Sequence, residues 1–198
     1  YKGSSVMKES TWSHIIAVTN RRLSARPYLE QIERICSRHP RALLVREKDL
    51  TEEEYGCLAG SVYEICRKYR VLCIYHSFVH KAFEMGAKAV HLPLPLLKKA
   101  GQDPVLKSFE AVGTSVHSAE EAREAVALGA SYLTAGHIYT TDCKKGLPPR
   151  GLSFLQEVCR TADLPVYAIG GIHTEEQIAE VMAAGAAGAC IMSGAMRI

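Results

Sequence analysis

Long apolar runs are missing from this chain of 198 residues, although 47% of its residues are hydrophobic. Gly, Pro or charged residues break the apolar stretches well short of the ~20 residues that a membrane-spanning helix needs, so we expect no membrane partner. Charge of one sign is scarce as well. The 24 Lys and Arg residues exceed the 21 Asp and Glu residues by only three. That surplus gives no basic surface of the kind that binds nucleic acid.

The cysteine spacings of zinc sites and redox motifs are also missing. The seven cysteines include no C-x-x-C pair, and their number is odd. Most lie among apolar neighbours, which indicates reduced thiols that fill a core and a cytoplasmic protein. Cys143 lies instead in a polar, lysine-rich stretch, where a reactive thiol is the less favoured alternative to a bystander.

The chain does contain a regular alternation of short apolar runs and longer amphipathic stretches. The runs predict eight strands, at residues 14–19, 42–46, 71–75, 89–92, 111–115, 132–136, 166–170 and 189–193. Helical spacing is present over residues 28–38, 52–68, 119–128, 152–160 and 175–184. The stretch after the fourth strand contains Pro93 and Pro95, so it predicts a short helix at best.

Strict alternation of this kind predicts an α/β fold with a parallel sheet buried on both faces. Eight strands favour a closed (β/α)8 TIM barrel over a flavodoxin-like or Rossmann fold, which would have fewer strands and usually a glycine-rich loop after the first one. We expect one barrel domain over residues 11–198 and a disordered or leftover segment over residues 1–10. The fourth helix is reduced, and the eighth is missing or truncated. A homodimer or other homo-oligomer would then cover the last strand.

The active site of such a barrel lies at the carboxyl ends of its strands. Gly170 and Gly171 follow the seventh strand, and Ser193 and Gly194 close the eighth. Barrels often bind phosphate between these two loops, through backbone N–H groups that glycine lets approach the anion. The alternative is a pair of tight turns that need a positive φ. We predict a phosphate site here.

A basic pair, Arg46 and Lys48, ends the second strand. These side chains suit a carboxylate or a phosphate, and a salt-bridged loop is an equally weighted alternative. Carboxylates are scarce at the strand ends, where only Glu47 and Asp142 follow closely. This scarcity argues against a divalent metal site and against a two-carboxylate glycosidase, so we expect no metal and no cofactor.

The longest polar connection, residues 137–150, follows the sixth strand and has the length of a lid. His137 begins this connection at the tip of the strand. A histidine at this position is more consistent with a role in proton transfer than with a structural role in the core. We predict His137 as the catalytic residue. His76 is a weaker pocket candidate, and His91, inside the fourth strand, is more consistent with a structural role. The predicted substrate-binding residues are Arg46, Lys48, Ser115, His117, Thr141 and Lys144.

Several segments resemble the thiamine phosphate synthase superfamily, namely residues 46–48, 113–118, 136–146, 168–172 and 192–194. The resemblance runs from about residue 15 to residue 193. The pattern Gly-His-x-x-x-Thr-Asp-Cys-Lys-Lys-Gly at residues 136–146 is similar to the TenI branch, the thiazole tautomerases. Synthases of the superfamily carry acidic motifs after strands three and four that hold magnesium. This chain has His76-Ser77 and Pro93-Leu94-Pro95-Leu96 there.

The resemblance implies a thiazole tautomerase of thiamine biosynthesis. Its substrate would be a carboxythiazole phosphate, which becomes the aromatic tautomer by proton transfer without a metal. Two alternatives stay open. One is a thiamine phosphate synthase, which joins hydroxymethylpyrimidine pyrophosphate to thiazole phosphate. The other is a non-catalytic regulatory protein that binds a thiazole or thiamine phosphate.

Overall fold

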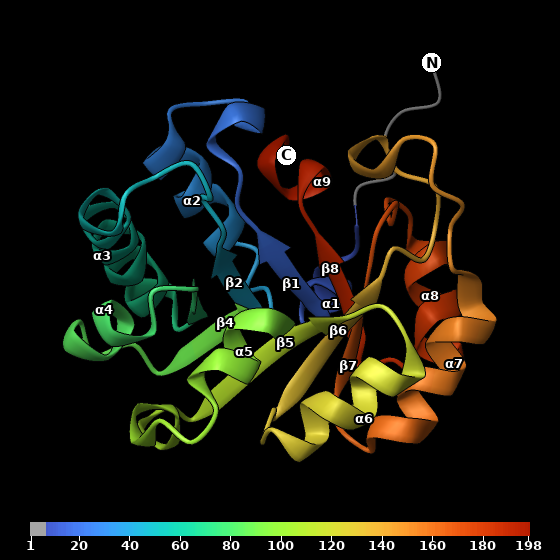
Figure 1. The fold of residues 1–198 in the computed structure, drawn as a ribbon. Coiled ribbons are helices and arrows are strands. Elements are labelled where there is room, and N and C mark those ends of the chain that lie inside the picture. Colours follow the sequence, from blue (N-terminus) through green and yellow to red (C-terminus); the bar gives the residue numbers. More distant parts are fainter. Residues whose placement is uncertain (1–6) are drawn as a thin grey trace.

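A computed structural model describes residues 7–198, and they form a closed barrel of eight parallel strands (Figure 1). Each strand pairs with its neighbour in the sequence, and β8 pairs with β1 to close the barrel. The (β/α)8 TIM barrel predicted from the sequence is therefore confirmed. Its strands are β1 (Ile15–Val18), β2 (Ala42–Val45), β3 (Leu72–His76), β4 (Ala89–Pro93), β5 (Ala111–Val116), β6 (Tyr132–Gly136), β7 (Val166–Ile169) and β8 (Gly188–Ile191).

The helices surround this barrel (Figure 1). The α-helices are α1 (Glu9–Trp12), α2 (Tyr28–Cys36), α3 (Glu52–Tyr69), α4 (Val79–Glu84), α5 (Leu94–Ala100), α6 (Ala119–Ala127), α7 (Gly151–Ala162), α8 (Glu175–Ala183) and α9 (Ser193–Met196). Three short 3-10 turns complete the structure: η1 (Arg21–Leu23), η2 (Pro104–Ser108) and η3 (Asp142–Lys144). In residues 7–198, no helix is both long and apolar enough to cross a membrane.

Short helices depart from the sequence-based expectation. Helix α4 lies outside the segments with predicted helical spacing, because it has only six residues and its N-cap, Phe78, offers no capping side chain. The predicted eighth strand was too long: β8 ends at Ile191, and Ser193 begins α9. Helix α5 is short, as expected, and its Pro95 lies in the first turn, where the missing N–H has no intrahelical partner.

After β8, the single turn α9 packs against α2. The Gln31 side-chain amide donates a 3.0 Å hydrogen bond to the Ala195 carbonyl, and the Ala25 N–H donates to the Met196 carbonyl. These bonds fix the turn that carries Ser193. The homo-oligomer expected from the short eighth helix stays a prediction.

The amino-terminal segment differs in part from the expected disordered stretch over residues 1–10. Residues 1–6 lie outside the described residues, whereas Glu9 and Ser10 belong to α1. The Lys8 N–H donates to one Glu175 carboxylate oxygen at 2.6 Å, and the Thr11 hydroxyl donates to the other at 2.8 Å. These bonds attach α1 to the start of α8.

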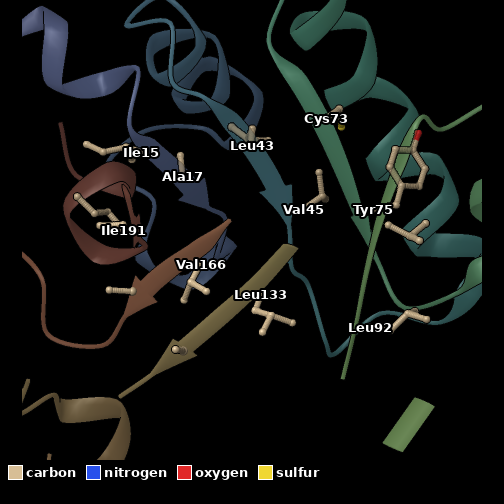
Figure 2. Close-up of a cluster of buried hydrophobic side chains, with 14 of the residues drawn as sticks. Ile15, Ala17, Leu43, Val45, Cys73, Tyr75, Leu92, Leu133, Val166 and Ile191 are labelled. Carbon is tan, nitrogen blue, oxygen red and sulfur yellow. The ribbon is translucent and has the colours of Figure 1, made fainter. Parts of the chain in front are cut away.

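The strand side chains alternate between two cores. Outward-facing residues such as Ile15, Leu43 and Leu133 fill the layer beneath the helices (Figure 2). Inward-facing residues such as Ile16 and Ile74 fill the barrel itself. The period of two is that of a β-strand, and burial on both faces explains the nearly continuous apolar runs in the sequence. Towards the carboxyl ends of the strands, the barrel interior becomes polar.

Candidate active site

Parallel pairing places the predicted site residues at one end of the barrel. Ser115 on β5 pairs with Pro93 and Thr134, and Ile169 on β7 pairs with Cys190 on β8. The residues that follow these strands therefore lie around one mouth, as expected for a TIM barrel. The predicted residues contributed by β2, β5, β6, β7 and β8 all lie at this end.

The wall of the mouth at β1 and β2 is built around a buried carboxylate. Glu47 is 5% exposed and accepts hydrogen bonds from the Thr19 hydroxyl at 2.6 Å and from the Arg21 N–H at 3.0 Å. The Arg21 guanidinium and the Tyr28 hydroxyl also donate to it, at 3.0 and 3.2 Å. Thr19 in turn accepts from the Arg46 N–H at 3.0 Å. Glu47 therefore fixes the backbone that carries Arg46.

A cluster of positive side chains extends from this wall to the lid. Burial lowers the pKa of Arg46. The charge of Arg46, then partial burial, then the charge of Lys144 lower the pKa of Lys48. Lys144 belongs to η3 in the connection between β6 and α7, so that connection comes close to β2. Among residues 7–198, no carboxylate forms an ion pair with Arg46, Lys48 or Lys144. The mouth therefore suits an anion.

The tip of β6 places His137 under the lid, where it is 6% exposed. Backbone hydrogen bonds join this tip to β7, since Ile138 N–H donates to the Ile169 carbonyl and Tyr139 N–H to the Gly170 carbonyl. Gly170 has a φ of +108°, and a Cβ there would lie 2.3 Å from the His137 Cβ. Glycine at residue 170 thus lets the two loops approach closely.

Both ring nitrogens of His137 have partners. The Arg150 guanidinium lies 3.3 Å from Nδ1, and the Leu147 carbonyl oxygen lies 3.4 Å from Nε2. A guanidinium can only donate, so Nδ1 accepts and carries no proton. The geometry therefore favours a ring hydrogen on Nε2, facing the Leu147 carbonyl. Arg150 also donates to the Gly136 carbonyl at 3.0 Å and to the His117 carbonyl at 3.2 Å.

A hydrogen-bonded group of neutral side chains lies inside the barrel below the mouth. His91 Nδ1 lies 2.9 Å from the Tyr132 hydroxyl, and its Nε2 lies 2.9 Å from the Ser115 hydroxyl. The Thr134 hydroxyl donates to Ser115 at 2.8 Å. We call these four residues the inner network. His91 is 2% exposed, in keeping with the structural role expected for it.

His76 stacks on His91, with ring centroids 5.8 Å apart. Burial and the charges of Arg46 and Lys48 lower the pKa of His76 to about 4. Burial, with smaller contributions from His76 and Arg46, lowers the pKa of His91 to about 3. Both imidazoles are therefore neutral at physiological pH. His76 lies beside the cationic cluster, as its interaction with Arg46 indicates.

Two of the predicted substrate-binding residues have other partners. The His117 ring lies 3.1 Å from the Glu121 carboxylate, and the His117 N–H donates to the same oxygen. This pair closes the first turn of α6. The Thr141 hydroxyl accepts from the Cys143 N–H and caps η3. Neither side chain joins the inner network or the contacts of His137.

The predicted phosphate turns lie side by side after β7 and β8. Gly171 has a φ of +70°, and a Cβ there would come within 2.3 Å of the Thr140 carbonyl oxygen. Ser193 and Gly194 begin α9, so their N–H groups have no intrahelical partner. The glycines are thus needed for the turn itself, as the alternative interpretation holds, and they also leave backbone donors at the mouth.

Sequence reasoning missed several residues of the mouth. Arg150 lies at the end of the predicted lid and was not singled out. Tyr132 and Thr134 were read only as parts of a strand, although Thr134 occupies an inward-facing position near the end of β6, where a hydroxyl is a signal. Thr19 gave no signal beyond its place after β1.

The described part of the chain contains no group of three His, Cys, Asp or Glu side chains that could hold a metal ion. After β3, the Ser77 hydroxyl oxygen lies 3.1 Å from His76 Nδ1. At the end of β4, Pro93 is followed by Leu94. These residues supply no carboxylate, the ligand through which proteins usually bind Mg²⁺.

Fold and mouth together define an α/β barrel protein whose site is cationic at the rim, polar at the floor and supplied with glycine turns after β7 and β8. The particular family follows from comparison with known proteins. A family model described as thiamine monophosphate synthase matches residues 15–195, and the chain belongs to this family.

Curated relatives agree with this assignment. The chain is 34% identical over 162 residues to a putative thiamine-phosphate synthase 2 of Aquifex aeolicus, a match that covers 82% of this chain and 87% of the relative. It is 32% identical over 181 residues to thiamine-phosphate synthase 2 of Streptococcus pneumoniae, covering 91% and 86% of the two chains. Both relatives carry the name of a synthase.

A solved structure of a thiamine phosphate pyrophosphorylase from Pyrococcus furiosus has a similar fold. Its TM-score is 0.80 at 27% identity, over 96% of this chain and 91% of that one. FabK from Thermotoga maritima, with a TM-score of 0.68 at 17% identity over 92% of this chain and 59% of that one, shares the fold alone.

Proposed function

We propose that this protein is a thiazole tautomerase of thiamine biosynthesis, in which a carboxythiazole phosphate becomes its aromatic tautomer by proton transfer. The observation that carries the proposal is the placement of His137, a buried imidazole at the tip of β6 beneath the lid, with Nδ1 facing Arg150. A neutral imidazole is the form that can act as a general base. The protein would work in the cytoplasm, where its seven unpaired cysteines stay reduced.

The contacts of His137 suggest how the proton moves. Nδ1 would take the proton from ring carbon C2, and the same nitrogen would return a proton to the exocyclic carbon. Nε2 would keep its hydrogen throughout, and the Leu147 carbonyl would stabilise the imidazolium that forms between the two steps. The Arg150 guanidinium has to leave Nδ1 first, and its 3.3 Å contact is long enough to be weak.

The other residues of the mouth would bind the substrate. Gly170, Gly171, Ser193 and Gly194 would hold the phosphate through N–H groups. Arg46 and Lys48, with Lys144 from the lid, would neutralise the carboxylate, since no acidic side chain pairs with them in residues 7–198. Ser115 would donate from the floor. His117 and Thr141 would take part only if they exchanged their present partners.

The test is the rate of tautomerisation of a carboxythiazole phosphate, followed by ultraviolet absorbance, together with loss of the C2 proton in D₂O, followed by NMR. We expect His137→Asn to fold and to lose at least a hundredfold in turnover, the scale of general base catalysis. His80→Asn is the matched control, because His80 is exposed on α4 and pairs with Asp103. Near-normal turnover in the His137 variant would exclude the mechanism.

The names of the relatives favour a second function, thiamine phosphate synthase. This reaction requires that the chain join hydroxymethylpyrimidine pyrophosphate to thiazole phosphate in the presence of Mg²⁺. The ends of β3 and β4 offer no carboxylate that would hold this ion. Formation of thiamine phosphate from these two substrates by the wild-type protein, without tautomerase activity, would replace our assignment by this one.

A further inference from the structure

In the inner network, the number of available hydrogens and lone pairs determines which atom donates and which accepts in each hydrogen bond. It begins at Tyr132, whose ring lies inside the barrel against Gly113, where a Cβ would come within 2.4 Å of the Tyr132 hydroxyl oxygen. The hydroxyl is therefore enclosed by protein. In the described residues, His91 Nδ1 is the one hydrogen-bond partner of this hydroxyl. A buried phenol has to donate its hydrogen, so Nδ1 accepts it.

The tautomer of His91 follows from this bond. Because His91 is buried and its pKa is lowered to about 3, the ring is neutral and carries one hydrogen. With Nδ1 accepting, that hydrogen is on Nε2, which donates to Ser115 at 2.9 Å. The opposite arrangement, with Ser115 donating to Nε2 and Nδ1 donating to Tyr132, would leave the Tyr132 hydrogen buried and unpaired.

A second donor reaches Ser115 from β6. Thr134 is 2% exposed, and its hydroxyl has the Ser115 oxygen as its hydrogen-bond partner at 2.8 Å. The Ser115 oxygen therefore accepts from both His91 and Thr134. A hydroxyl has two lone pairs and one hydrogen. Both lone pairs are occupied, and the hydrogen is left for a partner in the mouth, to which Ser115 is partly exposed.

We propose that Tyr132, His91 and Thr134 are positioning residues that make the Ser115 hydroxyl an obligatory donor to the bound substrate. The substrate must therefore present a lone pair at this point, on a carboxylate oxygen or on a heteroaromatic ring nitrogen. Ser115 could not accept a hydrogen bond from a ligand. The ligand chemistry rests on the proposed function, whereas the direction of the network does not.

The groups that face His91 come from three neighbouring elements besides its own strand. They are His76 on β3, Ser115 on β5 and Tyr132 on β6, and the charge of Arg46 at the end of β2 acts on it from further away. None is a carboxylate, so nothing nearby favours a charged ring. The donor direction should accordingly stay unchanged from pH 5 to pH 8.

The first experiment reads the tautomer directly, by nitrogen-15 NMR of histidine-labelled full-length protein. The signals that disappear in His91→Gln belong to His91. We expect an unprotonated Nδ1 and a protonated Nε2 throughout the range from pH 5 to pH 8. A protonated Nδ1, or a ring that titrates in this range, would overturn the proposal. This measurement needs neither ligand nor turnover.

The second experiment measures binding of the aromatic carboxythiazole phosphate by calorimetry. Ser115→Ala should weaken binding about tenfold, which is roughly 1.4 kcal/mol. Tyr132→Phe should also weaken binding, because His91 and Ser115 can then reverse their direction. The double variant should bind no more weakly than Ser115→Ala. Tyr167→Phe is the matched control, since Tyr167 packs on Tyr132 in the same interior and lies outside the network.

If the losses of binding affinity were additive in the double variant, or if Tyr132→Phe lost no affinity, the proposed role of the inner network would be contradicted. A thiazole phosphate without the carboxylate identifies the accepting atom. The effect of Ser115→Ala should vanish with this ligand if Ser115 contacts the carboxylate, and persist if it contacts the ring nitrogen. If the wild-type protein bound neither ligand, the proposed function would fail, and the NMR result would still decide the direction of the network.

Discussion

Replacing Glu47 by Gln should destabilise the whole protein, because this one buried carboxylate joins β1, β2 and α2. One carboxylate oxygen accepts from Thr19 and Tyr28, and the other accepts twice from Arg21. Every group around the carboxylate donates to it. The amide of Gln keeps one acceptor and replaces the other by a donor. That donor would face the two Arg21 donors in one orientation, and in the other it would force the Thr19 and Tyr28 hydroxyls to give up their donor role.

The size of the effect follows from the bonds lost. At least two hydrogen bonds to a charged, 5%-exposed acceptor disappear, each with a net contribution of about 1.5–3 kcal/mol. The free energy of unfolding should therefore fall by about 3–5 kcal/mol, the usual cost of breaking a buried pair. For a chain of this length, that corresponds to a decrease in Tm of roughly 10 °C. The Arg46 N–H also loses its fixed acceptor, so substrate binding should weaken.

Urea unfolding followed by circular dichroism measures this change, with the transition midpoint expected to fall by roughly 2 M at an unchanged slope. Asp49→Asn is the control, because Asp49 pairs with the same Arg21 at 3.0 Å but lies in solvent. That variant should unfold at the wild-type midpoint. If Glu47→Gln unfolded at the same urea concentration as Asp49→Asn, the buried carboxylate would not have the structural role that we assign to it.

Three further predictions concern the mouth. Gly170→Ala should cut turnover more than tenfold and lower Tm, because the new Cβ would lie 2.3 Å from the His137 Cβ at a φ of +108°; a melting curve and the tautomerase assay check this. Gly113→Ala should lower Tm by roughly 10 °C or prevent folding, since its Cβ would lie 2.0 Å from the Tyr132 ring. His76, with its pKa lowered to about 4, stays neutral in the native protein while the unfolded chain takes up a proton below pH ~6.5. The contribution of His76 to the free energy of unfolding should thus be complete above pH 6.5 and fall by about 1.4 kcal/mol per pH unit towards pH 4. Urea unfolding at several pH values should show a weaker pH dependence of this free energy in His76→Asn.

The barrel could be predicted from the sequence because burial on both faces produces apolar runs that stand out from amphipathic helices. Short elements could not. Helix α4 has six residues, too few for a helical period, and the turn α9 continued the apolar run of β8, so Ser193 was assigned to the strand. Tertiary packing on α2, rather than a local pattern, makes those residues helical.

The location of the predicted site residues at the mouth could be predicted from the topology of the barrel, whereas their hydrogen-bond and ion-pair partners could not. At the end of β2, the sequence is compatible with a salt-bridged loop and with an anion site. The structure contains the salt-bridged loop, since Glu47 pairs with Arg21, a residue contributed by η1. Arg46 is left without a carboxylate in the described residues, and the anion site stays a prediction. Likewise His137 was expected at the mouth, whereas Arg150 could not be paired with it, because the two residues lie thirteen positions apart in the sequence, at opposite ends of the lid.

The change from an apolar to a polar barrel interior is the property that distinguishes the mouth from the rest of the core. Lower in the barrel the inward positions hold residues such as Ile74 and Ala89, as TIM-barrel interiors usually do. One step towards the mouth on the same two strands, they hold His76 and His91. A buried polar layer costs stability unless its groups are hydrogen-bonded, and in residues 7–198 no buried side-chain nitrogen or oxygen lacks a partner. An apolar layer would satisfy the packing without this requirement, so the polar layer is best explained by a ligand that binds above it.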